Sequence, residues 1–348
     1  MSVIPPTMRA WTFDQAGTPE NVLKFNSTKP TPSPPIGSNV LVRVSYVALS
    51  SACTDLMNNI PSMLRHSAIP ELDFSGFIAQ AGPKAPSELS PGTAVFGTIP
   101  VLSAVLFGAG ALAEYVVVPA GNVIIKPKTV RLSEAAGLTS LAHTAILMVE
   151  RAKITAGDRV LVHGGGGDIG AMALQIAKGA GAEVMVTCSE SKINMVLQLG
   201  AEKVCSASRN SLYINLGNGI TQLQAIDYRA NQPLADFLSK HYGQQQFDVI
   251  LDTVGSQDLY EHSPAYLNLS GVYVNVGHIG VSTVLTVWRW LKNSVYPRLL
   301  GGVPRKFIQF SAIPTKERGE KIASLAAEKG IDILVDSTFK LEDALLVS

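Results

Sequence analysis

A glycine-rich turn between a short apolar strand and a helix constrains this chain more than any other feature. Residues 158–163 predict a buried strand, and residues 171–179 are typical of a helix. Between them, three glycines follow the spacing GxxGxxG: Gly164, Gly167 and Gly170. The first permits a tight exit from the strand, the second lets backbone N–H groups approach a pyrophosphate, and the third lets the helix pack close to the sheet. The turn therefore predicts a dinucleotide site at the start of the helix, around Asp168 and Ile169.

Strands and helices alternate through the rest of the chain after residue 127. Apolar runs predict strands at residues 183–187, 247–252, 271–276, 306–311 and 333–339. Helical spacing predicts helices at residues 132–151, 193–199 and 316–329, the first with Ser133 as N-cap. This alternation predicts an α/β fold with a doubly wound parallel sheet. A purely structural glycine turn is the alternative to nucleotide binding, and a P-loop is excluded because no Gly-Lys-Ser/Thr follows the turn.

Residues 1–127 have a different texture. Residues 40–48 alternate apolar and polar side chains, and residues 94–96 and 114–118 are further candidate strands, which together predict a β-rich barrel or sandwich. Residues 93–113 carry no charge and are long enough to span a membrane. Their glycines and Pro100 favour buried strands joined by turns instead.

The residues after the second strand of the nucleotide-binding half bear on the choice of cofactor. NAD sites usually place an acid there, which binds the ribose hydroxyls. Here Ser189 and Lys192 offer a hydroxyl and an ammonium group, which suit a 2′-phosphate and favour NADPH. Glu190 lies between them and keeps NADH open as the alternative.

Composition narrows the class of protein. The 348 residues suffice for two domains, and 28 basic against 27 acidic side chains give a net charge of +1, so binding of nucleic acid through bulk charge is excluded. Three widely spaced cysteines exclude a disulfide framework and indicate a reducing compartment. The N-terminus shows no secretory signal, so we expect a cytoplasmic protein without a membrane partner. A helix near Trp288 remains open between a membrane surface and a substrate-site wall or subunit contact.

The chain resembles the medium-chain dehydrogenase/reductase superfamily, specifically its zinc-independent quinone oxidoreductase (zeta-crystallin-like) and enoyl reductase branch. Besides the glycine turn, the matching stretches are residues 73–76, 91–97, 113–115, 134–139, 199–201, 226–229 and 252–255. This resemblance implies a GroES-like β-rich catalytic domain (1–127), a Rossmann NADP-binding domain (128–280) and a C-terminal return to the catalytic domain (281–348). It also implies hydride transfer from NADPH to a quinone, enone or enoyl-type small molecule, in a homodimer.

The resemblance assigns roles residue by residue. It implies that the three glycines hold the pyrophosphate and that Ser189, Lys192 and Tyr228 contact the 2′-phosphate. The nicotinamide is lined by Thr144, Val254, Val276 and Gly277. On the substrate side, the candidate catalytic residues are Tyr46, Ser50 and Asp55. For Tyr46, a place in the protein core is an equally good interpretation of the sequence, and for Asp55 an ordinary surface position is. A bound water molecule is the alternative to Tyr46 as proton donor.

Two departures from the family pattern matter. Zinc enzymes of the superfamily carry Gly-His-Glu, whereas this chain has Glu71-Leu72-Asp73, and a leucine cannot coordinate, so we expect no metal. Residues 204–224 interrupt an otherwise continuous match, and the family's final helix and strand are missing after residue 348. We therefore expect an insertion and a truncated C-terminal segment. A non-catalytic nucleotide-binding protein, or the inactive product of a mis-spliced reading frame, is the alternative function.

Overall fold

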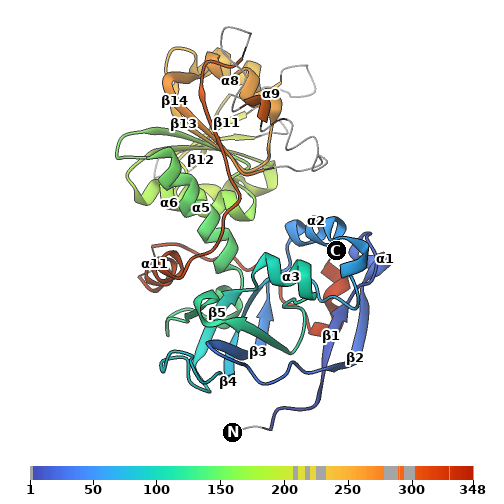
Figure 1. Ribbon diagram of the computed structural model, residues 1–348. Coiled ribbons are helices and arrows are strands. Elements are labelled where there is room, and N and C mark those ends of the chain that lie inside the picture. The colour runs from blue at the N-terminus through green and yellow to red at the C-terminus, as the bar shows by residue number, and fades with distance from the viewer. Residues whose placement is uncertain are drawn as a thin grey trace. The chain divides into compact units, whose positions relative to one another are not determined.

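The computed structural model describes residues 3–206, 211–215, 220–224, 233–277, 289, 291–293, 302–328 and 330–347. The chain forms two compact units (Figure 1). The first comprises residues 1–143, 313–329 and 333–348, and the second comprises residues 144–312 and 330–332.

The first unit is built around an antiparallel five-stranded sheet in the order β6-β3-β4-β5-β7. Its strands are β3 (Asn39–Val47), β4 (Asp73–Ala81), β5 (Ala94–Thr98), β6 (Tyr115–Pro119) and β7 (Val123–Ile125). A hairpin of β1 (Thr7–Thr12) and β2 (Lys24–Pro30) accompanies it. Alternate residues of β3 and β4, among them Val40, Val42, Phe74 and Ile78, form a buried core. The prediction of a β-rich first domain is thereby confirmed.

Short helices complete the first unit. They are α1 (Pro19–Val22), α2 (Ser51–Asn59), α3 (Val101–Phe107), α4 (Leu132–Ala135) and α11 (Lys316–Ala327). The prediction of buried strands throughout residues 93–113 was wrong: β5 is followed by α3, which starts after Pro100 and exposes Leu102 and Phe107. Its C-cap is Gly108 at φ 62°, a left-handed conformation that ends helices readily. Within the described residues, no helix is both long and apolar enough to cross a membrane.

Two further local predictions need correction. Ser133 is not an N-cap, because α4 already begins at Leu132 and the Glu134 carboxylate accepts a hydrogen bond from the backbone N–H of Arg131. The predicted helix over residues 132–151 is in fact α4 followed by α5 (Leu138–Ala152). Residues 333–339 form no strand, and Leu334 in that segment is half exposed.

The second unit contains an eight-stranded sheet in the order β12-β11-β10-β9-β8-β13-β14-β15. Its strands are β8 (Arg159–His163), β9 (Glu183–Cys188), β10 (Lys203–Ser206), β11 (Ser211–Asn215), β12 (Ile220–Gln224), β13 (Phe247–Asp252), β14 (Leu267–Asn275) and β15 (Lys306–Gln309). From β10 to β15 all neighbours are parallel. Numbered along the chain, these six strands follow the order 3-2-1-4-5-6 of a dinucleotide-binding fold, which confirms the doubly wound prediction.

The helices of this unit include α6 (Asp168–Gly179), α7 (Ile193–Gln198), α8 (Leu234–Tyr242) and α9 (Gln257–Glu261), and the greater part of α5 also belongs to it. Helix α6 packs against β8 and β9. The described parts of residues 204–224 add two antiparallel strands, β11 and β12, beyond β10. The segment interpreted as an insertion therefore prolongs one side of the sheet.

Candidate active site

The candidate site lies where the direction of strand connection reverses in the second unit. Strands β8 and β13 are neighbours in the sheet, with His163 opposite Asp252 at their carboxyl ends. Ligands of open α/β sheets bind at such a switch point, outside the carboxyl ends of the strands. The glycine turn follows β8 there, and Val254 follows β13.

The glycine turn is packed too closely for side chains at two of its three family positions. Gly164 has φ 80°, and a Cβ there would lie 2.6 Å from the Thr253 hydroxyl oxygen. A Cβ at Gly170 would lie 2.3 Å from the Gly164 carbonyl oxygen. Gly167 is the N-cap of α6, and a Cβ there would meet nothing closer than 3.5 Å. The first and third glycines are thus required by packing, and the second leaves open space beside the helix N-terminus.

The first turn of α6 is the part of the candidate site that suits an anion. The helix begins at Asp168, directly after Gly167, so the backbone N–H groups of its first turn have no partner within the helix. Asp168 is exposed and Ile169 is half-buried. These N–H groups and the helix dipole favour a negatively charged group such as a pyrophosphate.

His163 and Thr187 brace the entrance to the turn. The Thr187 hydroxyl oxygen accepts a hydrogen bond of 3.1 Å from the Gly164 backbone N–H and lies 2.7 Å from Nδ1 of His163. Burial lowers the pKa of His163, because the charged imidazolium loses its hydration. A neutral His163 therefore supports the turn structurally.

Asp252 organises the loop that follows β13. Its buried carboxylate accepts hydrogen bonds of 2.9, 2.9 and 2.8 Å from the backbone N–H groups of Val254, Gly255 and Ser256. The backbone of Gly277 packs directly against this loop, since a Cβ at Gly277 would lie 2.2 Å from the carbonyl carbon of Val254. The structure therefore brings together three residues predicted to line the nicotinamide: Val254, Val276 and Gly277.

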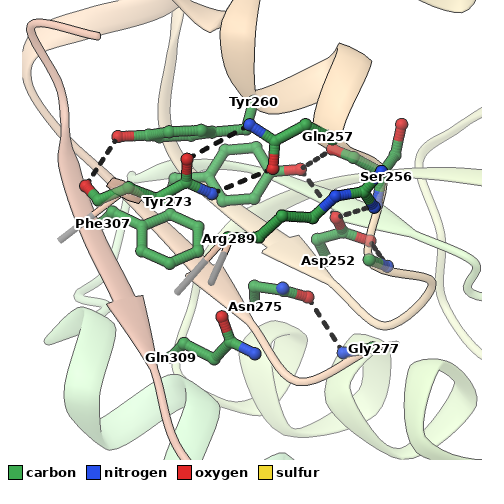
Figure 2. A pocket seen from close by; sticks show the side chains of 12 residues that line it. Asp252, Ser256, Gln257, Tyr260, Tyr273, Asn275, Gly277, Arg289, Phe307 and Gln309 are labelled. Atoms are coloured by element: carbon green, nitrogen blue, oxygen red, sulfur yellow. Dashed lines mark hydrogen bonds between the residues drawn. The ribbon is translucent and has the colours of Figure 1, made fainter. Parts of the chain in front are cut away.

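A small polar cavity lies beside this loop. Figure 2 shows side chains from β13, β14 and β15 around it, among them Asp252, Asn275 and Gln309. Arg289 lines the same cavity. The cavity has a volume of about 20 Å³, which has room for about one water molecule.

The residues predicted to recognise the 2′-phosphate divide into two groups. Lys192 lies against the turn, since a Cβ at Gly166 would be 3.1 Å from the Lys192 Cβ. Ser189 and Lys192 are exposed at the end of β9, and the hydroxyl oxygens of Ser189 and Ser191 are 3.2 Å apart. Tyr228 lies outside the described residues.

The other predicted site residues lie on β3, α2 and α5. Tyr46 is 41% exposed on β3, which excludes its reading as a core tyrosine. Ser50 is the N-cap of α2, and its hydroxyl accepts a hydrogen bond of 3.3 Å from the Ala52 backbone N–H. Asp55 is an exposed residue of α2, and Thr144 is half-buried on α5. Their catalytic and cofactor roles stay predictions.

No metal centre is assembled by the described residues: no three or more His, Cys, Asp or Glu side chains come together to hold an ion. Leu72 packs against the core of the first unit. Cys53 is buried, and burial raises the pKa of its thiol far above the ordinary value, so it is a poor nucleophile and a poor ligand.

Asp252 was not among the predicted site residues, although its carboxylate organises the loop of Val254. The signal was an acid at the end of the apolar run of residues 249–251, where a buried strand reaches its carboxyl end. In the sequence, Glu71 stands out only as a departure from the Gly-His-Glu metal motif. Its contacts depend on the path of the chain and leave no signal in the sequence.

Comparison with known proteins agrees with this geometry. A family model described as an alcohol dehydrogenase GroES-like domain matches residues 37–128, and one described as a zinc-binding dehydrogenase matches residues 169–296. The medium chain reductase pydE of an Acremonium species is 33% identical over an alignment of 363 residues, gaps included. The alignment covers 97% of this chain and 94% of that protein. The trans-enoyl reductase poxH of Penicillium oxalicum is 29% identical over 378 residues, which cover 97% and 93% of the two chains.

Among solved structures, the quinone oxidoreductase from Coxiella burnetii superposes with a TM-score of 0.75 at 24% identity, covering 98% of this chain and 94% of that one. At this identity the likeness concerns the fold. The 33% identical relative spans almost the whole chain, and the sheet order and glycine turn are those expected of its class. The chain therefore belongs to the medium-chain dehydrogenase/reductase superfamily and is an oxidoreductase of the nicotinamide-dependent kind.

Proposed function

We propose that this protein is an NADPH-dependent, zinc-independent reductase of carbon–carbon double bonds conjugated to a carbonyl group, with enoyl-type compounds, enones and quinones as its acceptor class. The observation that carries the proposal is the packing of Gly164 and Gly170 at the switch point, directly beside the loop of Val254. That arrangement supports a dinucleotide whose pyrophosphate lies at α6 and whose nicotinamide lies against Val254 and Gly277. Relatives described as trans-enoyl reductases favour the enoyl type.

The preference for NADPH rests on Lys192. Its ammonium group is carried by a side chain whose Cβ packs beside the glycine turn, and it lies in a segment with two serine hydroxyls. A cationic group with neighbouring hydroxyl donors suits a phosphate better than a ribose hydroxyl. Glu190, the acid that could serve NADH, precedes Lys192 on the same short 3₁₀ turn (Glu190–Lys192).

The chain's own contribution to such a reaction is positional. The bound reduced nicotinamide supplies the hydride. Asp252 fixes the loop of Val254, and the backbone of Gly277 closes against that loop, so both act on the orientation of the ring. Tyr46, exposed on β3, is our candidate for the group that delivers a proton or contacts the developing oxyanion.

A homodimer is part of the proposal. Strand β15 is the last strand of the described sheet and has a neighbour only on the β14 side. An unpaired strand edge is a template for pairing with another chain. Light scattering on the purified protein measures the mass in solution, and a monomeric mass at all concentrations contradicts this part.

Two measurements test the function. Calorimetry with NADPH and NADH should show heat with both and tighter binding of NADPH. Stopped-flow oxidation of bound NADPH should then be accelerated by at least one of an enoyl thioester, an enone or a quinone, and dialysis against a chelator should leave the rate unchanged. Absence of heat with either coenzyme overturns the nucleotide site. Tight binding without oxidation by any acceptor supports the non-catalytic alternative instead.

A further inference from the structure

Glu71, two residues before β4, has a strained backbone. It adopts φ 66°, in the left-handed region that residues with a side chain rarely occupy. The chain on either side is tied down, because the Glu71 carbonyl accepts a hydrogen bond of 2.8 Å from Ala111 N–H and the Pro70 carbonyl accepts one of 3.1 Å from Leu112 N–H. Glycine would adopt this conformation without strain.

Besides the strain of its backbone, Glu71 has a side chain whose burial is unfavourable. Its carboxyl group is largely withdrawn from solvent, and this burial, together with the nearby carboxylate of Asp73, raises its pKa to about 7. The titratable groups that face it are Cys53 on α2 and Asp73 on β4. A glycine at this position would avoid both the backbone strain and the desolvation.

The strained backbone and the buried carboxyl group of Glu71 allow contacts with the beginning of α2. Oε2 of Glu71 accepts a hydrogen bond of 3.2 Å from the Ser50 backbone N–H, and the Cys53 thiol hydrogen-bonds to the same carboxyl group. Ser50 is the N-cap of α2, and Cys53 lies in its first turn. The carboxyl group therefore holds the start of this helix at two points.

Asp73 provides a useful contrast. Its carboxylate binds the start of α5, with hydrogen bonds of 2.8 Å from the Ser140 N–H and 2.7 Å from the Ser140 hydroxyl. Asp73 has no left-handed backbone, and its role is explained by capping a helix whose residues are largely buried. Strain together with burial singles out Glu71, and strain of this kind tends to occur at functional positions.

We propose that Glu71 is a positioning residue that fixes the first turn of α2, and through it Ser50, for the substrate side of the reaction. The catalytic half of this inference rests on the proposed function and on the expectation, from the family resemblance, that Ser50 lies on the substrate side. The structural half, the fixing of α2, stands independently of any activity.

The structural half is tested by amide hydrogen exchange on the full chain. In Glu71→Gly, which relieves the strain and removes the carboxyl, amides of residues 50–53 should exchange roughly tenfold faster or more, while the melting temperature does not fall. Glu71→Gln keeps an acceptor for the Ser50 N–H and should restore slow exchange. Exchange in Glu71→Gly that matches wild type overturns the proposal, and so does acceleration spread over the whole first unit.

The catalytic half is tested by steady-state kinetics with an acceptor that accelerates NADPH oxidation in the stopped-flow measurement. Glu71→Gly should lower kcat/KM roughly tenfold or more while the NADPH dissociation constant stays within about twofold, and Glu71→Gln should recover most of the loss. The wild-type profile of kcat/KM should contain a transition near pH 7 that Glu71→Gln lacks. The control is Glu88→Gln, an exposed carboxyl of the same unit near Lys316.

The outcomes separate the two proposals. If wild type reduces no acceptor, the proposed function fails, and the exchange experiment still decides whether Glu71 fixes α2. If wild type is active and Glu71→Gly shows fast exchange with unchanged kcat/KM, α2 is fixed by Glu71 but does not position the substrate, and the catalytic half is overturned.

Discussion

The hydroxyl of Tyr273 donates a hydrogen bond of 2.7 Å to Oδ2 of Asp252, and both side chains are almost completely shielded from solvent. Burial raises the pKa of Tyr273 well above its ordinary value, so the phenol stays protonated and remains a donor. The same carboxylate receives three backbone N–H groups from the loop after β13. The pair thus couples the core of the sheet to the loop that carries Val254.

Asp252→Asn should destabilise this unit by on the order of 3 kcal/mol, because the amide nitrogen would face donors that now meet a carboxylate oxygen. Tyr273→Phe removes a single donor and should cost about 1 kcal/mol. Urea unfolding measures both. Asp258→Asn, at an exposed site beside His262, is the control and should change stability by less than about 0.5 kcal/mol. A mild Asp252→Asn phenotype, equal to that of the control, would mean that the loop does not depend on the carboxylate.

Gly170→Ala should lower both stability and coenzyme affinity, although alanine normally favours a helix by about 1 kcal/mol over glycine. The reason is the contact of 2.3 Å that the new Cβ would make with the Gly164 carbonyl oxygen. Gly179→Ala, at the last residue of the same helix, meets no atom within 4 Å and should be neutral or stabilising. Thermal unfolding and NADPH calorimetry should show a lower melting temperature and weaker NADPH binding for Gly170→Ala, and no loss of either for Gly179→Ala. Equal behaviour of the two variants contradicts the packing argument.

The glycine turn and its flanking strands were predictable because central parallel strands are buried on both faces. Four of the six residues in each of β9 and β13 are apolar, and their apolar residues predominate enough to indicate a buried strand without knowledge of the fold. The strand order then follows from few alternatives, since parallel crossovers are right-handed and short. This is why the switch-point site could be located from residues 158–179 and 247–254.

Features decided by competition between local and tertiary contacts were not predictable. The apolar residues of α3 suggested buried strands, yet Leu102 and Phe107 are exposed on a helix that Pro100 and Gly108 delimit. The left-handed backbone of Glu71 depends on hydrogen bonds from Ala111 and Leu112, about forty residues away, and no local pattern signals it.

Lys192→Ala should weaken NADPH binding by roughly 10- to 100-fold and leave NADH binding almost unchanged, because in the proposed site the Lys192 ammonium group makes a charge-assisted contact to the 2′-phosphate alone. Lys178→Ala, at an exposed lysine of α6 paired with Glu202, is the charge-matched control. Calorimetry with both coenzymes at one ionic strength separates a specific contact from a general effect of charge. Equal losses for NADPH and NADH, or equal effects of both substitutions, would contradict a 2′-phosphate site at Lys192.

His163 should make stability depend on pH in a direction opposite to that of Glu71. The pKa of His163 is lowered by burial, so between its folded pKa and the ordinary value of 6.5 the unfolded chain binds more protons than the folded chain. Its stabilising contribution is therefore complete above pH 6.5 and is lost as the pH falls. Glu71 has a raised pKa of about 7, so protonation of its carboxyl stabilises the folded state, and this gain is lost as the pH rises from about 4.5 to 7.

The two effects overlap, so the test compares variants with wild type at each pH. In His163→Gln, the free energy of unfolding should fall less steeply than in wild type as the solution is acidified below pH 6.5. The slope difference should not exceed one proton, or about 1.4 kcal/mol per pH unit. His262→Gln is the control: the pKa of His262 is raised by Asp258, so its contribution is present below pH 6.5 and lost above. A His163→Gln slope that parallels wild type would show that His163 binds a proton equally well in the folded and the unfolded chain, so that its place beside Thr187 and the glycine turn does not keep the imidazole neutral.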